Sequence, residues 1–238
     1  MSAAADHCLD LVRAADKDRF LASLFAPDSK RPALLGLYAF NIEIASVRNK
    51  VSEPALGEIR YQWWRDTIAE IYHGETSPHP VAQELARTIE TGALPQKPFQ
   101  DLISAREFDL YDDQMPDFAT LEGYLGETSS ALIQMASLVL AGPEARVGAR
   151  AAGLAGVAYG IARLLQEQNF IPQGLDPVAH ARMRLTEARA LRPTIVPAAF
   201  PAFLPASLTE LYLAKAGNEI SHIRRQIRLW WAARREKF

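Results

Sequence analysis

The chain has 238 residues, of which 49% are hydrophobic and 23% charged, a balance typical of a globular protein with its own core. Its 26 Lys and Arg residues against 28 Asp and Glu give a net charge of −2, which argues against a dedicated nucleic-acid-binding protein, so we expect no nucleic-acid partner. Cys8 is the only cysteine, which excludes an intrachain disulfide and a cysteine-based zinc site.

The start of the chain and its later apolar stretches do not predict export or membrane spanning. The first residues carry Asp6 and Asp10 where a secretory signal would have a basic region and an apolar run. No stretch reaches 18 strongly apolar residues. We therefore expect a cytoplasmic protein, which could contact the inner face of a membrane peripherally.

Helix-forming residues dominate the chain, and the alternating β-branched pattern of strands is almost absent. Proline and glycine residues separate the helical stretches. These stretches cover residues 2–25, 31–49, 55–73, 79–91, 97–112, 118–141, 144–169 and 206–236. We predict an all-α fold in which residues 1–238 form a single-domain helical bundle.

The densest group of acidic residues is Asp109, Asp112 and Asp113, just before Pro116. Asp109 and Asp113 are four residues apart, so they could share one helix face and hold a magnesium ion. The alternative is a solvated helix end with no ligand.

A proline-rich segment precedes the C-terminal region. Pro193, Pro197, Pro201 and Pro205 recur every four residues, and prolines at that density interrupt an α-helix. We therefore predict an irregular or polyproline-like connector over residues 192–206.

The connector leads into a predicted basic amphipathic helix over residues 207–236. Its apolar stripe consists of Ile220, Ile223, Ile227, Trp230 and Trp231, and six Arg and Lys residues lie between Arg224 and Lys237. A basic helix with paired tryptophans is typical of docking to a membrane or a partner, and the candidate docking residues are Arg224, Arg228, Trp230 and Trp231. Alternatively, the stripe packs on the domain and the arginines face water.

Four segments together resemble the squalene/phytoene synthase family: FLASLFAPDSKRPALLGLYAF (20–40), QWWRDTIAEIYHG (62–74), PVAQEL (80–85) and FDLYDDQMPDFATLEGYL (108–125). The resemblance implies an isoprenoid synthase-type bundle with a central cavity. It also implies enzymes that join two prenyl diphosphates head to head, with magnesium held by two aspartate-rich motifs.

The first aspartate-rich motif that the resemblance implies is missing. Counted from Tyr38, its three aspartate positions are Ala45, Ser46 and Asn49. Because magnesium is held by several oxygen ligands, this face of the cavity has lost its metal-binding chemistry.

The second motif is missing too. In GIARLLQEQNFIPQG (160–174), Arg163 stands for a glutamine and Gln166 for an asparagine, and Glu167 is the one carboxylate left nearby. We therefore assign no catalytic residue, no metal site and no cofactor, with magnesium needed only if the chain is an enzyme after all.

The candidates for ligand binding are of two kinds. Tyr38, Thr128 and Ser129 occupy positions like those that line the family's prenyl tunnel, and Arg163 and Gln166 replace family residues in the second motif. Arg163 could hold a diphosphate or an acidic headgroup directly, or it could simply pair with Glu167 one turn further on. The small residues around 153–160 fit either a retained prenyl tunnel or close helix packing.

A family scaffold without its aspartates resembles the non-catalytic branch of the family, which includes the mitochondrial assembly factor for respiratory complex I. The resemblance therefore implies a binding or assembly factor with a protein partner in respiratory-complex assembly, and with a pocket for a prenyl or lipid ligand. The alternative is an active head-to-head prenyltransferase that acts on farnesyl or geranylgeranyl diphosphate through a rearranged metal site. A third interpretation is a lipid carrier without chemistry.

Overall fold

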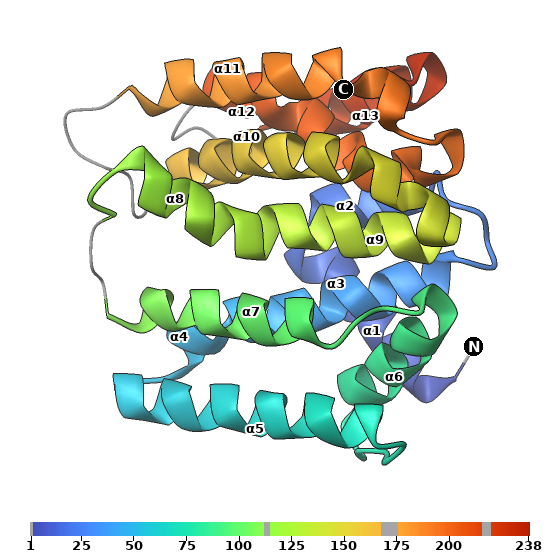
Figure 1. Cartoon of the computed structure of the whole chain (residues 1–238), viewed down its shortest axis with the longest axis vertical. Coiled ribbons are helices and arrows are strands. Elements are labelled where there is room, and N and C mark those ends of the chain that lie inside the picture. The colour runs from blue at the N-terminus through green and yellow to red at the C-terminus, as the bar shows by residue number, and fades with distance from the viewer. Residues whose placement is uncertain (1, 112–114, 168–175, 216–219) are drawn as a thin grey trace.

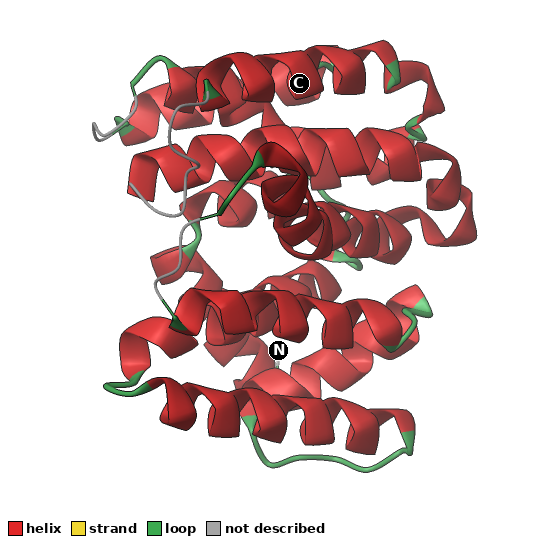
Figure 2. Ribbon diagram, turned by 60° about the vertical axis from the view of Figure 1, so that its left-hand side comes forward, coloured by secondary structure: helices red, strands yellow, loops and turns green. Residues whose placement is uncertain are grey.

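Helices account for all the regular secondary structure in the computed structural model, which describes residues 2–111, 115–167, 176–215 and 220–238 (Figures 1 and 2). They are α1 (Ala3–Ala15), α2 (Lys17–Ser23), α3 (Arg31–Ala45), α4 (Val47–Lys50), α5 (Pro54–Tyr72), α6 (Pro80–Gly92), α7 (Lys97–Arg106), η1 (Glu107–Leu110), α8 (Phe118–Leu125), η2 (Gly126–Ser130), α9 (Ala131–Ala141), η3 (Gly142–Gly148), α10 (Ala149–Glu167), α11 (Pro177–Ala190), η4 (Arg192–Thr194), η5 (Pro197–Leu208), α12 (Thr209–Leu213) and α13 (His222–Arg235). The predicted all-α bundle is confirmed.

The helices lie in layers along the long axis of the molecule, with α5 at one end and α11 at the other (Figure 1). The middle of the bundle is built around α3, which contacts α1, α6 and α9. Ten of its residues, from Ala33 to Ile44, are buried. This burial on nearly every side of the helix explains why α3 is apolar around its circumference.

Two of the predicted helices are broken at polar residues. The stretch 2–25 breaks at Asp16, whose side chain accepts a hydrogen bond from the backbone N–H of Arg19 at 3.1 Å and so caps α2. The stretch 31–49 breaks at Ser46, between α3 and α4. Both breaks matter for function because each opens onto the same cavity.

The predicted helix over 118–141 is continuous, but η2 is a π-helical turn within it. Here α10 approaches η2 closely: a Cβ at Gly156 would lie 2.4 Å from Cα of Ser130. Gly160 is similarly close to Leu125. Part of the small-residue stretch in α10 is therefore a packing feature, and π turns of this kind occur frequently at functional sites.

The proline-rich segment is helical and buried, so the predicted irregular connector is wrong. Residues 192–194 and 197–208 form the 3₁₀ helices η4 and η5, and nine residues of η5 are buried, including Phe200, Phe203 and Leu204. The φ angle that proline fixes is compatible with a 3₁₀ helix, and burial of the aromatic and aliphatic side chains favours this conformation over an exposed one.

The C-terminal region also differs from the single predicted helix over 207–236. It forms α12 and α13, with Ile220 and Ser221 outside either helix. Upstream, α11 was not predicted, although Asp176 caps it by accepting from the N–H of Ala179 at 2.9 Å and Pro177 opens it. No helix in the described parts of the chain has both the length and the apolar character to cross a bilayer.

We predict that Gly156→Ala destabilises the fold by about 1–3 kcal/mol, because the new methyl group would overlap the backbone of Ser130. The measurement is urea unfolding followed by circular dichroism. Gly153 is the matched control in the same helix, since a Cβ there meets nothing within 4 Å. Gly153→Ala is expected to be neutral or to stabilise the helix by up to about 1 kcal/mol. Equal stability of the two variants would contradict the close approach of α10 to η2.

Candidate functional site

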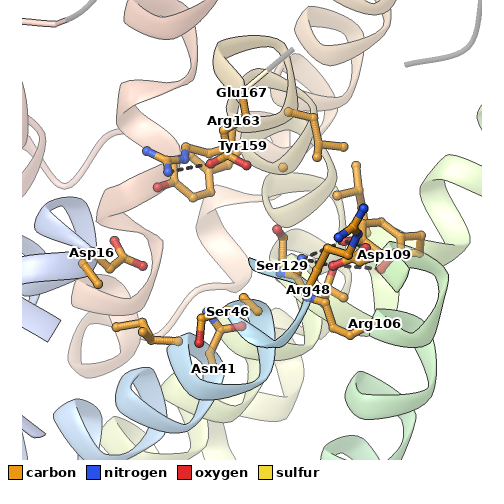
Figure 3. Close-up of a pocket in the computed structure, with 18 of the residues that line it drawn as sticks. Asp16, Asn41, Ser46, Arg48, Arg106, Asp109, Ser129, Tyr159, Arg163 and Glu167 are labelled. Carbon is orange, nitrogen blue, oxygen red and sulfur yellow. Dashed lines mark hydrogen bonds and ion pairs between the residues drawn. The ribbon is translucent and has the colours of Figure 1, made fainter. Parts of the chain in front are cut away.

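A cavity of about 550 Å³ lies where five parts of the chain meet (Figure 3). Its wall comes from the α1–α2 junction, from α3 and α4, from α7 and η1, from α8 and η2, and from α10. Among the residues that the structure describes, the charged ones on this wall are Asp16, Arg19, Arg48, Arg106, Asp109, Arg163 and Glu167. The cavity is therefore polar and carries four arginines against three carboxylates.

The three positions at which the first aspartate motif is missing all line this cavity. Ala45 ends α3, Ser46 lies at the break, and Asn49 follows in α4. Ser46 lies on one side of the cavity, and Arg163 and Glu167 of α10 lie on the other (Figure 3). At the three positions where the family's enzymes have carboxylates, this wall therefore carries small, uncharged side chains.

Each carboxylate that lines the cavity is paired with an arginine that also lines it. Arg19 Nη1 lies 2.6 Å from Asp16 Oδ2, and Arg163 Nη2 lies 2.8 Å from Glu167 Oε1. Arg106 Nη1 lies 3.0 Å from Asp109 Oδ2. The negative charge of the cavity is thus already neutralised by the protein's own side chains.

Asp109 is a buried member of a hydrogen-bonded group, and not part of a solvated helix end. Tyr124 Oη donates to Asp109 Oδ1 at 2.8 Å, and Arg106 Nη1 donates to Tyr124 Oη at 2.7 Å. Burial alone would lower the pKa of Arg106, but Tyr124 and Asp109 outweigh this effect and raise it. The other two acids of the predicted cluster, Asp112 and Asp113, lie outside the described residues.

Ion pairs also favour the charged forms of Asp16 and Arg163, on another part of the cavity wall. Burial would raise the pKa of Asp16, but the charge and hydrogen bonds of Arg19 outweigh it and lower that pKa below its usual value. Burial would likewise lower the pKa of Arg163, yet Tyr159 and the charges of Glu167 and Asp18 raise it. These groups are therefore ionised at neutral pH.

The residues that line the cavity do not fit the magnesium site that the family resemblance implies. Magnesium in such a site needs carboxylate oxygens free to approach it in octahedral geometry. The three described lining carboxylates instead each contact a guanidinium, which a metal ion would have to displace. Within the described ranges, no group of three or more His, Cys, Asp or Glu residues is arranged to hold a metal ion.

The five candidate ligand-binding residues do not all reach the cavity. Thr128, Ser129 and Arg163 line it. Tyr38 is buried behind the wall, with the Arg19 guanidinium 5.9 Å from its ring centroid. Gln166 Nε2 donates to the backbone oxygens of Tyr212 and Lys215, both at 2.9 Å, so it holds the end of α12. The predicted pairing of Arg163 with Glu167 is confirmed, and the pair lies on the cavity wall.

Sequence reasoning missed Asp16, Arg19, Arg48 and Arg106 as cavity residues. Asp16 and Arg19 lie three residues apart, and so do Arg106 and Asp109, which is a spacing that allows contact along a helix. That spacing predicts an ion pair, but it does not predict that the pair lines a cavity.

A buried carboxylate, Asp18, lies beside the cavity wall and joins four helices. Its Oδ2 accepts from Tyr159 Oη at 2.7 Å and from Tyr212 Oη at 2.6 Å. Its Oδ1 lies 2.7 Å from Arg225 Nε on α13. Arg163 Nη1 is 3.8 Å from Oδ2, so this network adjoins the arginine that faces the cavity. Below, these contacts are called the Asp18 network.

The candidate docking residues lie apart from the cavity, on α13. Trp230, Trp231, Arg224 and Arg228 are all exposed, and Arg228 Nε donates to the backbone oxygen of Ser207 at 2.9 Å. The alternative that the predicted apolar stripe packs on the domain holds for Ile220, which is buried, but not for the two tryptophans.

Comparison with known proteins agrees with this architecture. The sequence profile of the squalene/phytoene synthase family matches residues 12–169. The chain belongs to this family. Among solved structures, squalene synthase HpnC from Alicyclobacillus acidocaldarius has a TM-score of 0.76 at 20% identity, over 94% of both chains. A dehydrosqualene synthase with bound ligand has a TM-score of 0.77 at 16% identity, over 98% of this chain and 96% of that one. At these identities the likeness shows the fold alone.

Family members with similar sequences have two kinds of name. Proteins named NADH dehydrogenase (ubiquinone) complex I, assembly factor 6, from Bos taurus and Homo sapiens are each 29% identical over 88% of this chain, which corresponds to 72% and 73% of their own lengths. A presqualene diphosphate synthase from Rhodopseudomonas palustris is 28% identical over 53% of this chain and 45% of its own.

We predict that the folded protein loses stability in alkaline solution through the Asp18 network. Burial and the charge of Asp18 raise the pKa of Tyr212 to about 12, and burial raises that of Tyr159 well above its usual value. A raised pKa means that folding favours the neutral hydroxyl. The stabilisation is therefore complete below the unfolded pKa of about 10. It is lost as the pH rises through about 12.

Urea unfolding at a series of pH values tests this. Tyr212→Phe should unfold about 2 kcal/mol more easily at neutral pH, because it loses the hydrogen bond that Tyr212 donates to Asp18 and the one that it accepts from Arg225. Its loss of stability with rising pH should be shallower than that of wild type. Tyr111→Phe is the control for a tyrosine outside the Asp18 network: Tyr111 is exposed, and its pKa is raised by a hydrogen bond to Glu58 and not by Asp18. A Tyr212→Phe profile parallel to wild type would show that Tyr212 ionisation does not contribute.

Proposed function

We propose that this chain is a non-catalytic member of the squalene/phytoene synthase family that acts as an assembly factor for a respiratory complex of the NADH dehydrogenase type. The names of the relatives from Bos taurus and Homo sapiens support the assembly role. A protein partner within that complex and a cytoplasmic location with peripheral membrane contact belong to the same proposal.

The observation that carries the non-catalytic part is the chemistry of the cavity wall. Ionisation of an allylic diphosphate leaves a carbocation and a highly charged leaving group, which the family's enzymes neutralise with magnesium. Here Ala45, Ser46 and Asn49 offer no carboxylate, and the facing Glu167 is committed to Arg163. We therefore propose that the protein needs no magnesium and no other cofactor.

The remaining cavity suits a ligand with an anionic head and an apolar tail. Guanidinium groups bind phosphate oxygens through several N–H donors at once, and they do so without a metal ion. Arg19, Arg106 and Arg163 each bind a carboxylate through one Nη atom, and a guanidinium has five N–H donors, so each can also donate to a phosphate. Ile42 and Leu164 provide apolar wall. A prenyl or other lipid phosphate held in this way would be a regulatory or structural ligand of the assembly factor, and not a substrate.

We predict that farnesyl diphosphate binds without metal and is not turned over. Isothermal titration calorimetry in the presence of a chelator should show binding, because the arginines supply the positive charge. Addition of magnesium should release no pyrophosphate and yield no prenylated product. Sustained release of pyrophosphate would overturn the non-catalytic proposal and support the prenyltransferase alternative.

Arg163→Gln tests where that ligand binds. It should weaken binding by about ten-fold or more, the value of a hydrogen bond to a charged group. Arg150→Gln is the matched control, since Arg150 lies on the same helix but lines a different cavity. Thermal melting of both variants shows whether weaker binding is due to loss of the fold. Equal affinity in both variants would place the ligand elsewhere on the protein.

The assembly role is tested separately in cells. We predict that deletion of the gene lowers the amount of assembled NADH dehydrogenase complex, measured by native gel electrophoresis with an NADH-dependent activity stain. The wild-type gene should restore it. A deletion strain with normal levels of the complex would contradict the assembly role, whatever the cavity binds.

A further inference from the structure

The C-terminal helix α13 has two opposite apolar faces, of which the fold uses only one. Leu229 and Ala232 are buried, and α13 contacts η5 and α2. Arg225 lies on the same inner side and reaches Asp18. At 3.6 residues per turn, these positions cover a narrow arc of the helix.

The opposite face is strongly apolar and open to solvent. The exposed fractions are 67% for Ile223, 52% for Ile227, 47% for Trp230 and 44% for Trp231. Their spacing of four, three and one residues places them together on one side of the helix, away from Leu229. Four large apolar side chains on one exposed face indicate a binding surface, because isolated exposed residues are common but clusters are not.

Three arginines, Arg224, Arg228 and Arg235, lie along one edge of this face, and Arg234 lies within it. Arg224, Arg228, Arg234 and Arg235 are all exposed, and none of them forms an ion pair with an acidic side chain in the described part of the chain. The chain as a whole has a net charge of −2, so this positive charge is a local property of α13. An anionic partner is the electrostatic complement of such a face.

A groove of about 400 Å³ runs beside the apolar face. It is lined by Leu211, Arg224, Ile227, Arg228, Trp231 and Arg235. The groove thus combines three guanidinium groups with apolar walls. An anionic phosphate with an acyl chain attached to it matches both kinds of wall.

We propose that the outer face of α13 docks on the surface of a bilayer that contains anionic phospholipids. The helix would lie in the plane of the interface, with Ile223, Ile227 and the two tryptophans at the boundary of headgroups and acyl chains. Tryptophan favours this depth because its ring is apolar and its N–H is polar.

The contacts of the arginines favour a membrane over a folded protein partner. The Arg234 guanidinium lies 5.5 Å from the Trp230 ring centroid, and the Arg235 guanidinium 4.7 Å from that of Trp231. Each guanidinium therefore lies close to a tryptophan ring, so that in the proposed orientation its charge would be at headgroup level beside the ring. Phosphates at that level can bind the guanidinium without displacing it from the ring.

Co-sedimentation with vesicles tests the proposal on the full chain. Wild-type protein should bind vesicles that contain phosphatidylglycerol, bind phosphatidylcholine vesicles far more weakly, and be released by salt. Trp230→Ser/Trp231→Ser should largely abolish binding. Arg224→Gln/Arg235→Gln should weaken it by roughly 25-fold, at about five-fold for each arginine near an anionic surface.

Ile59 provides a matched control for the apolar contact. It is 66% exposed on α5, and Ile223 is 67% exposed on α13. The two helices lie in the lower and upper parts of the molecule (Figure 1). Ile223→Ser should weaken vesicle binding and Ile59→Ser should not, with both variants equally helical by circular dichroism.

Three outcomes would overturn the proposal. Failure of the wild-type protein to bind phosphatidylglycerol vesicles would overturn it and would assign the face to a protein partner. Equal binding to neutral and anionic vesicles would remove the role of the arginines. Unchanged binding of Trp230→Ser/Trp231→Ser would place the contact elsewhere. None of these results bears on the cavity or on assembly of the respiratory complex.

Discussion

A charge buried near the start of the chain is neutralised by groups near its end. The Asp18 carboxylate on α2 accepts hydrogen bonds from the hydroxyls of Tyr159 on α10 and Tyr212 on α12. It also lies against the guanidinium of Arg225 on α13. Removing one partner of such a buried pair typically costs about 3–5 kcal/mol, against a total stability of about 5–15 kcal/mol for a domain. The packing of the C-terminal helices on the bundle therefore depends on this one carboxylate. Because Tyr159 and Arg163 also form cavity wall, the same contacts fix the shape of the candidate site.

The sequence was sufficient to predict the fold class and the family, and the reasons are local. Long stretches with helical composition, separated by proline and glycine, leave few alternatives to a helical bundle. The boundaries were less predictable where two forces compete. At Asp16 and Ser46 the composition favours an uninterrupted helix, but Asp16 caps the N–H of Arg19, and the Ser46 hydroxyl donates to the backbone oxygen of Glu43. In residues 197–208 the prolines oppose an α-helix, yet burial of the phenylalanines still imposes a helical path.

The candidate site was predictable only in part. Ala45, Ser46 and Asn49 could be located by counting from Tyr38, and all three line the cavity even though the break at Ser46 puts Asn49 in α4. Arg19 and Arg106 could not be located in that way. They come from segments far apart in the sequence, and only the packing of α2 and α7 around α3 brings them together. Gln166 was a reasonable candidate by position, but its amide is used to hold the end of α12.

The use of guanidinium groups has a consequence for how any anion in the cavity would respond to acidity. Arginine does not lose its proton at any pH that a cell maintains, and the surroundings of Arg106 and Arg163 raise their pKa values further. None of the described residues that line the cavity is a histidine. A phosphate monoester gains its second charge near a pH of about 6. A change in affinity around neutral pH would therefore report the ionisation of the ligand and not that of the protein, so the pH profile alone would tell a phosphate monoester from a carboxylate.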